Sequence, residues 1–338
     1  MKNWQNCFGQ SKYKTNLTFL GVAIVCILSI LLSLCMGSAK LSLTEIFYAI
    51  AEGADSGVAG RVFWYVRLPR TAGCVLAGAG LAVSGAIIQN VLTNKLASPG
   101  IIGVNAGAGL AVTTSCAFGF ISGWAIAGAA FAGSLLAVLL VAFTAQKVGA
   151  SKSTVILGGV AVNSFLTSLT EAIITLHPEA GMQTGDFRVG GFSSVAYTRL
   201  IPAGALILVG LVLTLTLCNE LDVMSLGEDT AQGLGLPVKK MRTVFLGLAA
   251  MLAGASVSFA GLLGFVGLII PHAARKLVGG ESRKLIPFCA LGGAAFVTAC
   301  DLIARTLFMP YEIPVGILLS FIGGPFFIFL LLKRRRHT

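Results

Sequence analysis

The side chains best suited to bind an anion are two arginines in the stretch VRLPR, Arg67 and Arg70, which stand at the start of a long apolar run. A third, Arg305, lies in the stretch CDLIAR, one helical turn after Asp301. A guanidinium group forms paired hydrogen bonds with a carboxylate. The three arginines therefore have two interpretations: a basic collar that docks an acidic partner, or side chains that extend to lipid headgroups.

Other residues that could carry chemistry are few. Glu171 and Asp301 are the main carboxylates within apolar segments, and Asp301 has a local partner in Arg305, which disfavours a proton relay. His272 stands alone, as structural histidines usually do. The sequence contains no cluster at metal-ligand spacing, no hydrolase motif and no phosphate-binding loop GxxxxGK[ST]. We therefore predict a chain that is not an enzyme, holds no metal or cofactor, and leaves ATP and Mg²⁺ to a separate partner.

The elements that position these residues are predicted to be membrane helices. Apolar residues make up 56% of the 338 residues and charged residues only 11%, with a mean hydropathy of +0.90. Soluble domains are about a quarter charged. The apolar residues come in blocks of about 20, the length of a membrane-spanning helix. The 8 cysteines are scattered, mostly within these blocks, which suits small apolar core residues better than disulfides or zinc ligands.

The hydropathy pattern predicts about ten spans in a single transmembrane domain covering residues 1–338. Their positions are 17–36, 66–90, 98–118, 122–146, 153–176, 198–217, 243–262, 265–277, 285–308 and 313–332. The first block is not interpreted as a secretory signal, because more apolar blocks follow it instead of a cleavage site and a hydrophilic domain. The small-residue pairs Gly103/Gly107 and Gly119/Gly123 favour close packing within one subunit over packing between two copies.

The distribution of charge predicts that both ends of the chain are cytoplasmic. An even number of spans puts the N-terminal segment 1–16 and the basic C-terminal segment 333–338 on one side. Most of the 24 lysines and arginines then fall on that side. The net charge of +11 therefore indicates orientation in a membrane rather than nucleic-acid binding. In this topology Arg67, Arg70 and Arg305 lie on the outer side, where basic residues are otherwise scarce.

The connection 218–242, predicted to be cytoplasmic, has the pattern of a short amphipathic helix that meets a partner. Ser225 and Glu228 have the spacing of a capping box, and leucines and an alanine form a small apolar face. Such a face suits a groove of another protein. A helix resting on lipid is the alternative, but anionic headgroups would repel its acidic first half. The residues predicted to meet the partner are Ser225, Leu226, Gly227, Glu228, Ala231, Leu234, Gly235 and Leu236.

Three blocks of the sequence are similar to the FecCD-type permeases, the membrane subunits of ABC importers for iron–siderophores, haem and vitamin B12. The blocks are RLPRTAGCVLAGAGLAVSGAIIQN followed by NKLASPGIIGVNAGAG, then SLGEDTAQGLGLPV, then GFVGLIIPHAARKLVGGESRKLIP, which continues into CDLIAR and IPVGILLSFIGGPFFIFLLLK. The resemblance runs from Leu17 to Lys333. One departure is Lys95, which follows Asn94 where the family usually has proline, so the turn between the second and third spans is expected to differ.

The resemblance implies an all-α integral membrane protein of about ten transmembrane helices, like the vitamin B12 importer permease, a type II ABC importer. It implies a homodimer in a bacterial or archaeal cytoplasmic membrane, with two cytoplasmic ABC ATPase subunits and an extracytoplasmic substrate-binding protein. Arg67, Arg70 and Arg305 would then meet acidic residues of the binding protein. The segment 225–236 would sit in a cleft of the ATPase, and the loop 176–197 would narrow the substrate path on the outer side.

The implied cargo is an iron–siderophore complex, with haem or cobalamin carried by the same machinery as the alternative. Two other classes of membrane protein are less consistent with the sequence. An ion-coupled secondary transporter is disfavoured by the scarcity of charges within the spans, and a membrane enzyme by the absence of a catalytic set of residues. Dependence of transport on ATP hydrolysed by a separate subunit distinguishes the importer from both.

Overall fold

The computed structural model describes residues 2–37, 42–54, 56–147, 152–309 and 311–334, and within these ranges every regular element is helical. The ten predicted spans correspond to helices α1 (Lys2–Cys35), α4 (Leu68–Val91), α5 (Val104–Ala117), α6 (Gly123–Lys147), α7 (Lys152–Leu176), α10 (Tyr197–Thr216), α13 (Val238–Ala260), α14 (Val266–Val278), α15 (Ser282–Thr306) and α16 (Val315–Arg334). Seven helical stretches in the described part are long and apolar enough to cross a membrane. The basic tail from 335 onward lies outside the described residues.

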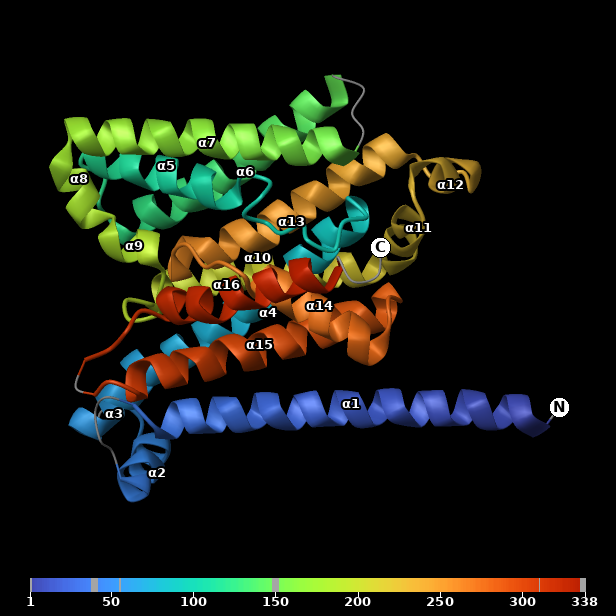
Figure 1. Cartoon of the computed structure of the whole chain (residues 1–338). Helices are drawn as coiled ribbons and strands as arrows, with labels where there is room; N and C mark the ends of the chain where they lie inside the picture. Colours follow the sequence, from blue (N-terminus) through green and yellow to red (C-terminus); the bar gives the residue numbers. More distant parts are fainter. Residues whose placement is uncertain (1, 38–41, 55, 148–151, 310, 335–338) are drawn as a thin grey trace.

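Shorter helices connect these long ones. They are α2 (Leu43–Glu52), α3 (Val58–Val62), the π-helical turn η1 (Phe63–Arg67), α8 (Pro178–Gln183), α9 (Gly185–Val189), α11 (Cys218–Ser225) and α12 (Glu228–Gly233). Figure 1 shows α2 and α3 at one end of the helix bundle and α12 at the opposite end. These are called the α2 end and the α12 end below. The sequence topology predicts that the α12 end is cytoplasmic.

The core of the bundle is formed by α4 and α13. Most residues of both helices are buried, and α4 packs on α13, α14 and α15. By contrast, α1, α7 and α10 expose apolar side chains such as Leu20, Phe165 and Leu208. An all-round apolar helix satisfies its own backbone groups in lipid, so these outer faces suit the bilayer.

Small residues allow α4 to approach its neighbours closely. A Cβ atom at Gly78 would overlap the carbonyl group of Gly293 in α15, and one at Gly85 would overlap Gly267 in α14. Close backbone contact of this kind holds helices together in lipid. Gly107 behaves in the same way within this chain, because a Cβ there would overlap the carbonyl group of Gly133 in α6, whereas Gly103 lies at ordinary contact distance from Ala137 of the same helix.

We expect Gly85→Ala to lower the thermal stability of the purified protein in detergent. The added methyl group has no room beside Gly267 and must push α4 and α14 apart, at a cost of about 1–3 kcal/mol. Gly128→Ala is the matched control, because Gly128 in α6 has open space around its Cβ position. If both variants melt like the wild-type chain, the close α4–α14 contact does not hold this fold together.

The helix that contains VRLPR begins earlier than predicted. α3, η1 and α4 form one helical stretch from Val58 to Val91, whereas the predicted span began at 66. Pro69 has no N–H to donate, and the wider π turn before it, with the N–H of Leu68 bonded to the carbonyl of Phe63, carries the helix past this position. Arg67 and Arg70 therefore lie inside a long helix and not at its mouth.

The cysteines act as small core residues, as predicted. All seven whose side chains are described are free thiols, and six of them are buried. Cys218 lies outside the spans, and there burial raises the pKa of the thiol to about 11. This thiol stays protonated at neutral pH, so it is a poor nucleophile and a poor metal ligand.

Candidate functional site

Five charged residues lie together near the α2 end, and they are here called the arginine cluster: the buried Arg67, Arg70, Asp301 and Arg305, and the partly exposed Glu312. Its centre is Arg70, whose Nε and Nη2 atoms each donate to Asp301 at 3.0 Å. The Nη1 atom of Arg70 donates to Glu312 at 2.7 Å. The two-pronged pair with Asp301 joins α4 to α15.

The other two arginines fasten α1 to the cluster. Arg67 Nη1 donates to the carbonyl groups of the last two residues of α1, at 2.8 and 2.7 Å. Arg305 Nη2 donates to the carbonyl and the hydroxyl oxygen of Ser33, at 2.6 and 2.7 Å. Cations stabilise the unpaired carbonyl groups at the end of a helix. The predicted local pair is also present, with Arg305 Nε 3.6 Å from Asp301 Oδ2.

The structure places Arg67, Arg70 and Arg305 inside the bundle, where their guanidinium groups bond other groups of this chain. Docking of a binding protein by these residues stays a prediction. Their exposed fractions are 2%, 7% and 2%. The reason is that the helix carrying VRLPR starts at residue 58 and α1 ends beside it, which places the guanidinium groups within the bundle. There the carboxylates of Asp301 and Glu312 compensate their charge.

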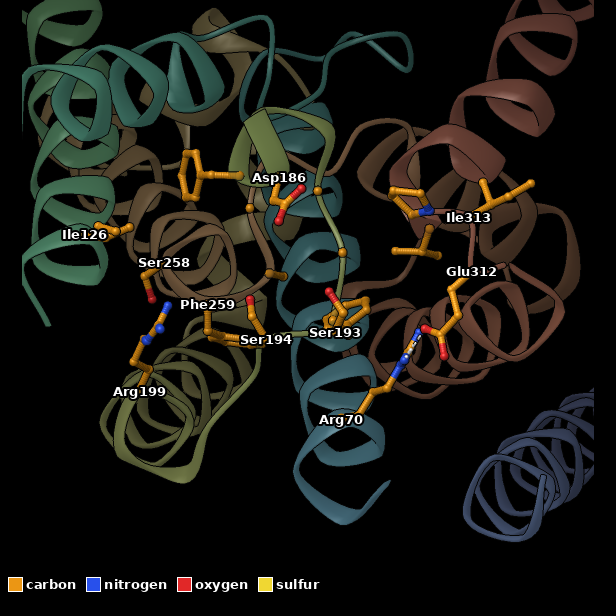
Figure 2. Close-up of a pocket in the computed structure, with 18 of the residues that line it drawn as sticks. Arg70, Ile126, Asp186, Ser193, Ser194, Arg199, Ser258, Phe259, Glu312 and Ile313 are labelled. Carbon is orange, nitrogen blue, oxygen red and sulfur yellow. Dashed lines mark hydrogen bonds and ion pairs between the residues drawn. The ribbon is translucent and has the colours of Figure 1, made fainter. Parts of the chain in front are cut away.

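A cavity of about 260 Å³ adjoins the arginine cluster, and Arg70 and Glu312 form part of its wall. Figure 2 shows this pair joined at one side of the cavity, with Arg199 and Ser258 at another. The remaining wall comes largely from the predicted narrowing loop, through residues 183–194, and from the end of α13. The cavity wall offers hydrogen-bond donors and acceptors to a polar solute. The groups are the guanidinium groups of Arg70 and Arg199, the carboxylates of Asp186 and Glu312, and serine hydroxyls.

The remaining chemical candidates have structural partners. Glu171 accepts a hydrogen bond from Arg188 at 2.6 Å, so both carboxylates singled out within the spans face an arginine. Both side chains of this second pair are about half exposed, where an ion pair contributes little to stability. The ring of His272 packs edge-on against Phe326, with ring centres 5.9 Å apart, which fits the predicted structural role.

The coupling segment, residues 218–242, contains the predicted short helix as α12, but the predicted capping box is wrong. Ser225 is the last residue of α11, and its hydroxyl donates to the carbonyl of Asp222 at 2.7 Å. Gly227, with φ at +107°, turns the chain between Ser225 and α12, so the two residues of the box do not meet. Glu228 instead accepts a hydrogen bond from Arg242 at 2.8 Å, which ties α12 to α13.

The end of α12 follows the glycine signal in the sequence. Gly235 has φ at +81°, its N–H donates to the carbonyl of Gln232 at 2.9 Å, and the N–H of Leu236 donates to the carbonyl of Ala231 at 3.0 Å. These two bonds are the Schellman arrangement that ends helices at a glycine. Both bonds are made within residues 231–236, so the end of the short helix is defined by the chain itself.

The predicted apolar face of the coupling segment is divided in two. Ala231 is fully buried and packs inward, whereas Leu226 and Leu234 are 60% and 63% exposed. The two leucines are therefore the large apolar side chains of the coupling segment that remain accessible in this chain.

Sequence reasoning missed two sets of residues. Glu312 stands in the non-helical stretch before α16, and nothing nearby in the sequence relates it to Arg70, 242 positions away. At the α12 end, Asp222 accepts hydrogen bonds from the backbone and the hydroxyl of Ser282. The sequence does not mark Ser282 as a functional residue. The glycines before Ser282 signal the end of α14, but no local signal indicates which residue caps the start of α15.

Comparison with known proteins matches this fold and its motifs to one family. The sequence model of the FecCD transport family matches residues 25–333. The chain is 36% identical over 319 residues to the Fe(3+)-citrate import system permease of Bacillus subtilis (strain 168), covering 94% of this chain and 95% of the relative. It is 33% identical over 319 residues to the hemin transport system permease of Yersinia pestis, covering 92% and 95%. It is 35% identical over 323 residues to the vitamin B12 import system permease of Shigella boydii, covering 94% and 95%.

The fold agrees with a solved structure of the same class. A metal-chelate type ABC transporter in an inward-facing conformation matches with a TM-score of 0.83 and 29% identity, covering 94% of this chain and 99% of that one. The region matched by the family model includes the arginine cluster and the coupling segment. The chain therefore belongs to the FecCD transport family and is an integral-membrane permease of an ABC importer.

Proposed function

We propose that this chain moves an iron–siderophore complex across the cytoplasmic membrane as half of a homodimer. In this proposal two ABC ATPase subunits bind ATP and Mg²⁺ and supply the energy, and a substrate-binding protein delivers the cargo. The observation that carries the proposal is the exposed pair Leu226 and Leu234, which flanks α12 at the opposite end of the bundle from the polar cavity beside Arg70. One end is suited to a protein partner and the other to a polar solute.

The choice of an iron chelate is supported by the relatives. Their names include permeases for Fe(3+)-citrate, iron(3+)-hydroxamate and hemin as well as for vitamin B12. Haem or cobalamin is therefore the alternative cargo for the same machinery. The orientation is supported by the basic residues, which gather at the α12 end in a topology with both termini in the cytoplasm.

Docking of the binding protein is proposed at the α2 end, close to the arginine cluster. Arg70 is the arginine whose side chain reaches the cavity there, and its partner Glu312 is partly exposed. Acidic residues of a binding protein would approach Arg70 at this wall. Arg67 and Arg305 would support the docking surface from beneath by holding the end of α1 against η1 and α15, respectively.

Uptake in proteoliposomes tests the proposed function. The vesicles contain this chain, its ATPase and its binding protein, and are offered ferric citrate, a ferric hydroxamate, hemin or cobalamin. We expect uptake of a ferric chelate that requires ATP and is lost when the ATPase carries a disabled phosphate-binding loop. Uptake of hemin or cobalamin alone would assign the alternative cargo. Uptake driven by an ion gradient without ATP would contradict the importer.

A further inference from the structure

A chain of hydrogen bonds joins the coupling segment to the ends of two core helices. Asp222 in α11 accepts from the backbone N–H of Ser282 at 2.9 Å and from its hydroxyl at 2.6 Å, both at Oδ1. The hydroxyl oxygen of Ser282 accepts from Asn90 Nδ2 at 3.3 Å. Hydrogen bonds between side chains thereby connect the coupling segment with the first residue of α15 and the last turn of α4.

The network continues into α14. Arg275 Nη2 donates to Asn90 Oδ1 at 2.8 Å, and Arg275 Nη1 donates to Gln89 Oε1. Gln89 Nε2 in turn donates to the carbonyl of Gly267 at 3.1 Å. Ser282, Gln89 and Asn90 are all buried. Because a buried polar group that loses its partner costs about 1–3 kcal/mol, this network resists being pulled apart.

Asp222 takes the place of an N-cap residue for α15. Glu281 occupies the N-cap position of that helix, but its side chain makes no capping bond, and the N–H of Ser282 is instead satisfied by Asp222. A carboxylate at a helix N-terminus is also favoured by the helix dipole. Since the acceptor belongs to α11, the start of α15 cannot separate from the coupling segment without losing this contact.

α4 and α15 are held together along their whole length. Asn90 meets Ser282 at the α12 end, Gly78 lies against Gly293 in the middle, and Arg70 meets Asp301 at the α2 end. Tightly packed helices move as units, because packed interfaces do not deform continuously. A displacement of α15 at the α12 end therefore reaches Arg70 and the cavity beside it.

We propose that Asp222 is the positioning residue that passes movement of the coupling segment to the α4–α15 pair, and through it to the cavity wall at Arg70 and Glu312. The inference rests on the proposed function, because it takes an ATPase bound at α12 as the source of the movement. In this role Asp222 acts through Ser282, from which it accepts both hydrogen bonds.

Hydrogen–deuterium exchange of the permease–ATPase complex in lipid nanodiscs tests this role without knowledge of the cargo. In the wild-type complex, trapping with ATP and vanadate is expected to change exchange both at α12 and in the stretch 311–314 beside the cavity. In Asp222→Ala the change at α12 is expected to remain and the change at 311–314 to disappear. ATP-driven uptake should fall about tenfold, the size of a typical coupling between sites, while the ATPase still copurifies.

Three further variants make the test specific. Asp222→Asn keeps an oxygen acceptor for Ser282 and is expected to restore the response at 311–314. Ser282→Ala removes the hydroxyl but keeps the backbone N–H, and is expected to weaken the response even if Asp222→Ala does not fold. Lys284→Gln is the control, since Lys284 pairs with Glu281 on the surface of the same helix turn.

Several results would overturn the role of Asp222. One is a normal response at 311–314 in both Asp222→Ala and Ser282→Ala. Another is loss of the ATPase from Asp222→Ala, which would assign the residue to partner binding. A wild-type complex in which nucleotide changes neither α12 nor 311–314 would overturn the proposed function, and the role of Asp222 with it.

Discussion

Asp301→Asn is expected to cost the folded protein about 3–5 kcal/mol, the range measured when one partner of a buried ion pair is removed. Asp301 is 1% exposed and lies against both Arg70 and Arg305. Without its negative charge, the three guanidinium groups of the arginine cluster remain in the bundle with only the partly exposed carboxylate of Glu312 beside them. The variant should therefore yield little monodisperse protein in detergent, and what remains should melt well below the wild-type chain.

Glu312→Gln is the control for this loss. The carboxylate of Glu312 bonds the same arginine, but its side chain is 29% exposed, so water can replace part of what the substitution removes. Its melting temperature is expected to lie close to that of the wild-type chain. If Asp301→Asn instead folds normally and only weakens binding-protein association, the arginines serve docking directly and the cluster is not a structural element.

The double variant Leu226→Ala/Leu234→Ala is expected to fold normally and to lose its ATPase. Both leucines are more than half exposed, so their side chains add little to the packing of the chain itself. Burying a leucine against a partner contributes about 1.5–3 kcal/mol. Losing two should weaken association by about a hundredfold or more, seen as failure of the ATPase to copurify and loss of ATP-driven uptake.

Leu208→Ala/Leu215→Ala provides the matched control on the lipid-facing side of α10, where both leucines are also exposed. It removes the same number of atoms from a surface that does not belong to the coupling segment, and should leave copurification unchanged. Equal copurification from both double variants would show that α12 is not where the ATPase binds. A lower melting temperature of the α12 variant alone would assign the leucines to folding.

The sequence by itself determined the membrane class, the helical fold and nearly all the spans. Each of these depends on local order along the chain, because a backbone in lipid must satisfy its hydrogen bonds within its own helix. The same holds for the Asp301–Arg305 pair, one turn apart on one helix, and for the end of α12 at Gly235. The order of three motif blocks was enough to indicate the family.

The tertiary structure alone decided what the charged residues do. Arg70 and Asp301 are 231 positions apart, and Asp222 and Ser282 are 60 apart, so their pairing depends on which helices pack together. The spacing of Ser225 and Glu228 suited a capping box, yet a turn at Gly227 gave each a different partner. Spacing describes which residues share a helix face, whereas burial and charge compensation depend on neighbours that the linear order does not specify. That is why an arginine collar expected at the surface lies inside the protein.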